Sequence, residues 1–170
     1  MAITLTEPLI GEVCFGKVFL KDNFAIKVFK RPTASTEQDL DPVDINDETN
    51  RIKKKFKSEV KAYQKAWEID ELRHYVIHFR GERVVAGVFA TDNKDVSDHY
   101  LLDCAYAMDY LQVEWIKYDA ANSVESAHMV KDIFEQHGIN AMKDFSFYLD
   151  GNENDVGIID FAIEEYPLYV

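Results

Sequence analysis

A lysine in an alternating strand pattern, preceded by two glycines, is the feature of this chain best suited to chemistry. Lys27 follows three less polar residues at 24–26, and Gly11 and Gly16 precede it. Glycine lets a backbone approach a ligand closely, and a lysine among apolar neighbours requires an anion. These residues predict a site that holds phosphate groups. The alternative is a plain hairpin with a solvated lysine and two turn glycines.

The strands that would position Lys27 form a predicted β-hairpin. Residues 17–21 and 24–30 alternate polar and apolar side chains, and Asp-Asn at 22–23 tolerates the positive φ of a tight turn. Successive side chains of a strand point to opposite faces. Lys27 should therefore share its face with Ala25 and Phe29.

A helix is predicted over residues 52–72 from an apolar stripe at helical spacing. The stripe consists of Phe56, Val60, Tyr63 and Trp67. Glu59 projects from the same side, where an unpaired carboxylate costs several kcal/mol of desolvation. We expect Glu59 to pair with Lys27. The alternative is that Glu59 lies at the edge of the stripe and reaches water or pairs with Lys55.

Asp160 follows the apolar residues Ile158 and Ile159 near the C-terminal end of the sequence. A carboxylate at the end of a buried strand suits a hard cation, which takes oxygen ligands and keeps several waters. Asp160 is therefore the candidate metal ligand. An ordinary strand-terminal aspartate is the alternative.

Two of these stretches resemble the motifs of protein kinases. Gly11, Gly16 and Val18 fall on the pattern G-x-G-x-x-G-x-V, with Val13 at the middle glycine, and residues 24–27 fall on the V-A-I-K strand. Asp160-Phe-Ala matches the Asp-Phe-Gly segment, with alanine in place of glycine.

The resemblance implies ATP and Mg²⁺ or Mn²⁺ as cofactors and gives each residue a role. Lys27 would contact the α and β phosphates, Glu59 would orient Lys27, and Asp160 would hold the metal. Residues 107–111 resemble the hinge between two lobes. The implied cofactor-binding residues are Gly11, Val13, Gly16, Val18, Ala25, Lys27, Met108 and Asp109.

The catalytic loop of the family, H-R-D-L-x-x-x-N, has no match between residues 138 and 154. Asp144 is the candidate for the acid that orients a substrate hydroxyl, with Lys143 as a neighbouring phosphate contact. Asp150, Asn152 and Asn154 lie near the place for another metal ligand, but they fall in an expected hairpin turn. The helix-terminal positions expected for His137 and Asn140 suit local backbone contacts.

The predicted fold is α+β and protein-kinase-like, with a five-stranded antiparallel N-lobe, an αC helix and a truncated helical C-lobe. Further antiparallel strands are expected at 74–79, 84–90 and 100–110. Asn122 and Glu125 resemble a capping box for a helix that ends at Gly138.

Two domains are expected, an N-lobe at 1–111 and a second part at 112–170 with the hinge, a helix and the metal-binding segment. Residues 31–51 are polar, with two prolines and six acids, and are expected to be a surface loop that contacts a partner or has no function. The sequence resembles a minimal or truncated kinase, as compact as some bacterial effector kinases, because it stops ten residues after Asp160.

The overall charge indicates which partners suit the chain. Its 170 residues carry 31 acids and 19 bases, a formal net charge of −12, which argues against direct nucleic-acid binding and favours a protein partner with a basic surface. No stretch is long and apolar enough for a membrane span, and no secretory signal is evident, so a cytoplasmic protein is expected, inside a host cell if it is an effector. Cys14 and Cys104 lack the spacing of a zinc site.

Three functions remain open from the sequence. The first is a minimal kinase-like phosphotransferase acting on a protein hydroxyl. The second is a pseudokinase, a binding or regulatory module that keeps the nucleotide lobe but is impaired in catalysis. The third is an acidic interaction protein or nucleic-acid mimic.

Overall fold

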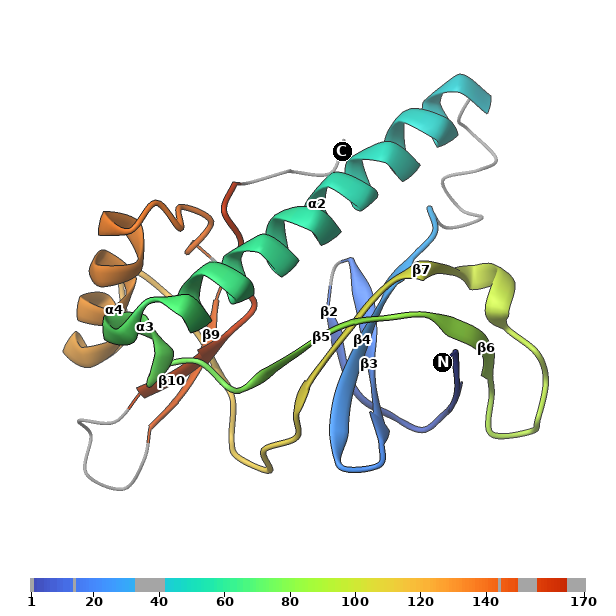
Figure 1. Cartoon of the computed structure of the whole chain (residues 1–170), viewed down its shortest axis with the longest axis horizontal. Coiled ribbons are helices and arrows are strands. Elements are labelled where there is room, and N and C mark those ends of the chain that lie inside the picture. The colour runs from blue at the N-terminus through green and yellow to red at the C-terminus, as the bar shows by residue number, and fades with distance from the viewer. Residues whose placement is uncertain (1, 14, 33–41, 144, 150–155, 165–170) are drawn as a thin grey trace. The chain divides into compact units, whose positions relative to one another are not determined.

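The computed structural model describes residues 2–13, 15–32, 42–143, 145–149 and 156–164. The chain is a mixed α+β protein (Figure 1). It divides into two compact units, which are described separately. Unit 1 is built from Met1–Phe56 and Arg80–Tyr110, and unit 2 from Lys57–Phe79 and Leu111–Glu165. The units therefore interleave along the sequence.

Unit 1 contains the five-stranded antiparallel sheet that the sequence predicts. The order across the sheet is β2 (Leu9–Val13), β3 (Gly16–Lys21), β4 (Phe24–Lys30), β7 (Tyr100–Asp109) and β5 (Phe79–Arg83). The predicted hairpin is confirmed, because β3 and β4 pair antiparallel and Asp22 and Asn23 have φ of 50° and 66°. Positive φ at both central residues matches the twist of the flanking strands.

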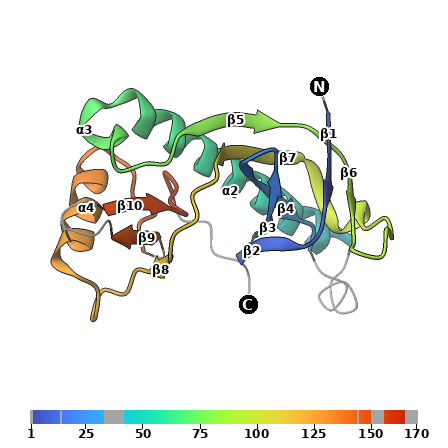
Figure 2. The same cartoon turned by 90° about the horizontal axis from the view of Figure 1, so that it is seen from below.

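A second, two-stranded sheet covers one face of the five-stranded sheet in unit 1. It pairs β1 (Ile3–Thr6) in parallel with β6 (Val85–Phe89), and the two strands lie side by side in Figure 2. The antiparallel pairing expected for residues 84–90 is therefore wrong, and β1 itself was not predicted. The sequence could not indicate this pairing, because parallel strands that are far apart in the chain are not joined by a tight turn with a recognisable sequence. The resulting core includes Leu5, Phe19, Ile26, Val28, Val85, Val88, Tyr100, Ala105 and Ala107.

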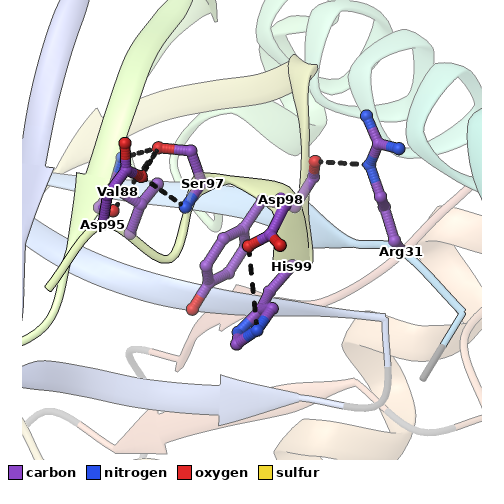
Figure 3. A network of polar contacts seen from close by, with 7 residues as sticks. Arg31, Val88, Asp95, Ser97, Asp98 and His99 are labelled. Carbon is purple, nitrogen blue, oxygen red and sulfur yellow. Dashed lines mark hydrogen bonds and ion pairs between the residues drawn. The ribbon is translucent and has the colours of Figure 1, made fainter. Parts of the chain in front are cut away.

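The connection from β6 to β7 is held by a small polar network around Ser97 (Figure 3). The Asp95 carboxylate accepts hydrogen bonds from the Ser97 backbone N–H at 2.9 Å and from its hydroxyl at 2.5 Å. The Ser97 hydroxyl oxygen in turn accepts the Val88 N–H at 2.9 Å. These hydrogen bonds from Ser97 lower the pKa of Asp95 below its ordinary value. The network ties the connection to β6.

The long helix α2 (Pro42–Glu68) begins earlier than the sequence pattern indicated. Residues 42–51 are helical, so the surface loop expected over 31–51 is wrong for its second half, while residues 33–41 lie outside the described residues. Pro42 occupies the first helical position, where its missing N–H costs nothing. The buried stripe also extends back to Ile52, and the Thr49 hydroxyl donates to the Ile45 carbonyl at 2.8 Å.

The strand expected over residues 74–79 is also absent from the described structure. His74 ends the short helix α3 (Asp70–Arg73), and Val76 makes only an isolated bridge to Ile158. The Tyr75 ring meets the Phe134 ring edge-on, with ring centroids 6.4 Å apart. The apolar residues of this stretch thus serve packing within unit 2, and β5 starts only at Phe79.

Unit 2 combines α4 (Glu125–Gln136) with a three-stranded sheet of β10 (Val156–Ile159), β9 (Ser146–Leu149) and β8 (Ile116–Lys117), visible in Figure 2. Gly138 ends α4 as predicted, with φ of 80° and a hydrogen bond from the Ile139 N–H to the Phe134 carbonyl at 3.1 Å.

The expected capping box at the start of α4 is wrong, because the N-cap is Val124 and no side chain caps it. Asn122 instead donates to the Asp119 carboxylate at 2.8 Å, and Asp119 also accepts the Ala121 N–H at 2.9 Å. These hydrogen bonds lower the pKa of Asp119. Asp119 thus organises a turn before the helix, and the Asn122 side chain contacts this aspartate and does not cap α4.

Candidate functional site: a buried lysine and a strand-terminal aspartate

Lys27 is buried in the middle of β4, with 4% of the residue exposed. Its Nζ lies 4.9 Å from the centre of the Phe29 ring and 6.0 Å from that of Tyr106. Phe29 is two residues further along the strand, and Tyr106 is the partner of Lys27 on β7. The aromatic faces stabilise the ammonium group by cation–π contacts. Strand alternation thus puts this lysine among apolar neighbours, as the sequence indicated.

Seven of the residues predicted to bind a cofactor share one face of the unit 1 sheet. Register across the strands aligns Gly11 with Val18 and Val18 with Lys27. One pleat further, Leu20 pairs with Ala25 and Ala25 with Met108. Directly paired residues of neighbouring strands point to the same face. Gly16 pairs with Phe29, which is on the same face as Lys27, and Val13 pairs with Gly16. The seven are Gly11, Val13, Gly16, Val18, Ala25, Lys27 and Met108. We call this surface the lysine face.

Asp109 does not belong to the lysine face, because it pairs with Phe24, which packs against the core on the other side. Its carboxylate is held by Arg80, with Nε 2.6 Å from Oδ1 and Nη2 3.0 Å from Oδ2. This hydrogen bonding raises the pKa of Arg80. The Asp109 side chain therefore serves to fix β5 near the end of β7.

Gly16 and Gly11 differ in how much space a side chain would have at each position. A Cβ at position 16 would lie 2.7 Å from the Val28 carbonyl oxygen and 3.4 Å from Cε of Lys27, whereas one at position 11 would meet Val18 at an ordinary 3.7 Å. Close approach of β4 thus requires Gly16. Val13, at the middle position of the motif, pairs with Gly16 at the end of β2. Neither fact assigns a ligand to this turn.

Glu59 is the second buried charge, on the half of α2 that belongs to unit 2, with 3% of the residue exposed. Among the residues whose burial the structure gives, Lys27 and Glu59 are the charged residues counted as buried. Neither is without an interaction partner. The sequence prediction that Glu59 projects from the buried side of its helix is confirmed by this burial.

Asp160 directly follows β10 in unit 2 and has an unusual backbone, with φ of 62°. Its N–H donates to the Tyr63 hydroxyl oxygen at 3.1 Å, and its Oδ2 accepts a long hydrogen bond from the Ser146 hydroxyl at 3.4 Å. Left-handed backbone at a residue other than glycine is uncommon and gathers at functional sites. The residue is half-buried, and the Ser146 hydroxyl orients its carboxylate.

The segment after Asp160 is rigidly held. Phe161 is fully buried, and its ring lies 4.4 Å from that of Tyr63 and 5.2 Å from that of Phe134. Ala162 and Ala141 form an antiparallel bridge with backbone hydrogen bonds of 3.0 and 3.3 Å. The two residues that follow the candidate metal ligand are therefore held by ring packing and by backbone hydrogen bonds.

A magnesium-type site at Asp160 fits its surroundings. Within the described ranges, no group of three or more His, Cys, Asp or Glu side chains is placed to hold a metal. Mg²⁺, however, usually keeps several waters and is bound through one or two carboxylates together with substrate phosphates. The Asp160 carboxylate, beside the Ser146 hydroxyl, could supply one protein ligand of such an ion.

The remaining candidates of the catalytic loop cannot be placed. Asp144, Asp150, Asn152 and Asn154 lie outside the described residues, although β9 and β10 pair antiparallel as a hairpin would. Lys143 is exposed. His137 forms the C-cap of α4 and contacts Glu71, with Nε2 2.8 Å from Oε2.

Three residues near these groups were missed from the sequence. Tyr106 was recognisable in principle, since it lies in an alternating strand, but its pairing with Lys27 depends on the register between distant strands. Tyr63 was counted in the apolar stripe without attention to its hydroxyl. Ser146 carries no signal of its own, because its contact with Asp160 arises from strand pairing in the last hairpin.

In the described residues, the fold is mixed α+β, with the lysine face in unit 1 and the oriented Asp160 in unit 2. Comparison with protein-family models finds none that matches the chain. Searches among curated proteins and among solved structures find no match either. None of the described helices is both long and apolar enough to cross a bilayer.

Proposed function

We propose that this protein is a minimal kinase-like phosphotransferase that binds ATP with Mg²⁺ or Mn²⁺ and acts on a protein hydroxyl. The observation that carries the proposal is the lysine face. A buried lysine lies among the residues that the kinase-like motifs single out, and Gly11, Val18, Ala25 and Met108 share its side of the sheet.

The lysine face has the chemistry that a nucleotide needs. Its apolar side chains, together with Leu20, which pairs with Ala25 and is 44% exposed, would offer an apolar surface for a purine ring. The Lys27 ammonium provides a point charge for the phosphates. Burial strengthens the attraction between this charge and a phosphate, because the surrounding dielectric constant is lower than that of water.

Glu59 is proposed as the partner that orients Lys27. Within unit 1, Phe29 of β4 and Phe56 of α2 meet edge-on with ring centroids 5.4 Å apart. If Lys27 and Glu59 pair, each buried charge would offset the desolvation of the other.

Asp160 is proposed to hold the metal, which would neutralise the phosphate charge during transfer. In the transfer itself, a bond forms between the acceptor hydroxyl oxygen and the γ-phosphorus while the bond to the ADP oxygen breaks. The hydroxyl proton would pass to Asp144. Such a reaction depends mainly on positioning and charge, so a small scaffold can support it.

Transfer of labelled γ-phosphate to the protein itself and to a basic acceptor such as histone tests this proposal. Lys27→Ala and Asp160→Ala should each abolish transfer. Lys30→Ala is the matched control, since Lys30 lies on the same strand but pairs with Glu12 at the surface, and it should retain activity. Full activity in Lys27→Ala or Asp160→Ala would overturn the assignment.

A double-mutant cycle tests the pairing of Lys27 with Glu59. Lys27→Met or Glu59→Gln alone should lower the free energy of unfolding by about 3 to 5 kcal/mol, because each leaves a buried charge uncompensated. The double variant should lose much less than the sum. Additivity within about 0.5 kcal/mol would show that the two side chains do not interact.

A pseudokinase is the second candidate, favoured by the segment after Asp160. Alanine occupies the position of the family's glycine, and Ala162 is fixed by its bridge to Ala141. The absence of a catalytic-loop motif points the same way. Thermal stabilisation by a nonhydrolysable ATP analogue and Mn²⁺, without phosphate transfer, would select this function. Neither binding nor transfer would leave an acidic interaction protein.

A further inference from the structure

The backbone of Asp160 is held in its uncommon conformation by a residue from another element of unit 2. Tyr63, on α2, is fully buried, and its hydroxyl oxygen accepts the Asp160 N–H at 3.1 Å. The φ of 62° at Asp160 costs on the order of 1 kcal/mol or more in an unrestrained chain. The rest of the fold therefore has to supply an interaction that stabilises this conformation.

The Tyr63 ring has little freedom to move its hydroxyl. It stacks on Phe79 with centroids 5.5 Å apart and an interplanar angle of 11°, and it packs on Phe161 at 4.4 Å. Because the hydroxyl accepts the Asp160 N–H and the ring packs on Phe161, the next residue, Tyr63 holds the backbone on both sides of Asp160. The position of the hydroxyl thus determines the direction in which the Asp160 side chain leaves the backbone.

A second hydroxyl acts on the carboxylate itself. The Ser146 hydroxyl donates to Oδ2 of Asp160 at 3.4 Å, and Ser146 pairs with Ile159 across the β9–β10 hairpin. Residues paired across strands point to the same face. Pairing places Ser146 on the face of Ile159, and the left-handed backbone of the next residue, Asp160, brings its carboxylate within reach of the Ser146 hydroxyl.

We propose that Tyr63 and Ser146 are positioning residues that set the metal affinity of Asp160, Tyr63 through the backbone amide and Ser146 through the carboxylate. The inference rests on the proposed role of Asp160 as metal ligand. Tyr63 touches neither metal nor nucleotide in this scheme. Its effect is to keep the carboxylate in the orientation that a cation requires, so that binding does not first have to order it.

A purely structural role for Tyr63 is the competing explanation, since a buried hydroxyl can simply satisfy a backbone N–H. The two explanations differ in what they predict for metal binding. Loss of a structural hydrogen bond lowers stability alone, whereas loss of a positioning hydrogen bond also weakens the binding of a cation to the folded protein.

The experiment measures Mn²⁺ binding to the full chain by the paramagnetic resonance signal of free Mn²⁺, in the presence of a nonhydrolysable ATP analogue. Tyr63→Phe keeps the ring and removes the acceptor. It should raise the Mn²⁺ dissociation constant about three- to tenfold, the loss of one modest hydrogen bond. Ser146→Ala should raise it by about two- to threefold, since its contact is longer, and Ser146→Thr should restore it.

Tyr118→Phe is the matched control. Tyr118 is a buried tyrosine of the same unit whose hydroxyl bonds to Nδ1 of His128 at 2.7 Å. This variant should lose stability in urea but bind Mn²⁺ like the parent protein. Mn²⁺ affinity unchanged in both Tyr63→Phe and Ser146→Ala would overturn the inference, as would an equal loss in Tyr118→Phe.

Asp160→Asn separates failure of this inference from failure of the proposed function. If Asp160→Asn binds Mn²⁺ as well as the parent protein, Asp160 is not the metal ligand and both proposals fall. If Asp160→Asn abolishes binding while the hydroxyl variants leave it unchanged, only the positioning role falls. Should Tyr63→Phe not fold, Ser146→Ala against Ser146→Thr decides the carboxylate half of the proposal in the same assay.

Discussion

Unit 1 and unit 2 hold their candidate functional residues in different ways. Lys27 lies in the middle of a regular strand, and its direction follows from the alternation of β4 and its register with β3 and β7. Asp160 lies just beyond a strand, in left-handed backbone, and its direction depends on hydrogen bonds from Tyr63 and Ser146. Regular structure positions the first residue, and specific side chains position the second.

The difference teaches where a substitution should act. On the lysine face, many backbone hydrogen bonds share the task, so a single side chain outside the face has little influence on Lys27. Around Asp160, a few side-chain contacts fix the orientation of the carboxylate, so a single substitution there should change that orientation. The predictions below test this contrast, beginning with the largest expected effect.

Gly157→Ala should be the most damaging small substitution in unit 2. A Cβ at this position would overlap the ring of Tyr148, its partner across the β9–β10 hairpin. Moving the ring should lower the free energy of unfolding in urea by roughly 2 to 3 kcal/mol. Adding Tyr148→Ala should recover part of the loss, and a single variant as stable as the parent protein would contradict the packing described here.

Gly16→Ala tests the regular strands of unit 1. The added Cβ would lie 2.7 Å from the Val28 carbonyl oxygen, so β3 has to shift against β4. A loss of about 1 to 2 kcal/mol is expected in the same urea assay. Gly11→Ala, which makes only an ordinary 3.7 Å contact, should change stability by less than about 0.5 kcal/mol. Equal effects of the two variants would remove the distinction between these glycines.

Tyr100 should make unit 1 sensitive to alkaline pH. Burial, with Glu7 and Glu12 nearby, raises its pKa from 10.0 to about 12. The unfolded phenol therefore loses its proton first, and its contribution to stability is intact below about pH 10 and declines toward pH 12. Tyr100→Phe should flatten this decline in urea midpoints, whereas Tyr110→Phe, at an exposed site, should leave it unchanged.

Asn23→Gly should give the smallest effect, a gain in stability. Asn23 has φ of 66° in the β3–β4 turn, a conformation that glycine adopts without strain. An increase of roughly 0.5 kcal/mol in the free energy of unfolding is expected, with Asn23→Ala moving in the opposite direction. A gain from alanine would mean that the turn is not of the type described.

The predictions from sequence were most accurate for features that local patterns determine. The β3–β4 hairpin, the burial of Lys27 and Glu59 and the end of α4 at Gly138 all follow from alternation, helical spacing or turn chemistry. The misses have a common cause. The parallel partner of β6, the early start of α2 and the failure of residues 74–79 to form a strand depend on contacts between distant segments, which no local pattern records.

The candidate site divides in the same way. The members of the lysine face could be named from a motif and then assigned to one side of a strand, because β-structure has a period of two. The surroundings of Asp160 could not, since the hydroxyl of Tyr63 looks like any other position in an apolar helical stripe. Asp109 shows the converse, because a residue chosen for its place in a motif is occupied by an ion pair with Arg80.

The parallel pairing of β1 with β6 has a consequence for biosynthesis. Ile3 pairs with Val85, so the first strand leaves the ribosome about eighty residues before its partner exists. At roughly 5 to 20 residues per second, this delay lasts about 4 to 16 seconds. During that time, Phe19, Ile26 and Val28 lack the cover that Leu5, Val85 and Val88 later provide. The nascent chain should therefore expose an adhesive apolar surface that a chaperone can shield until translation passes residue 89.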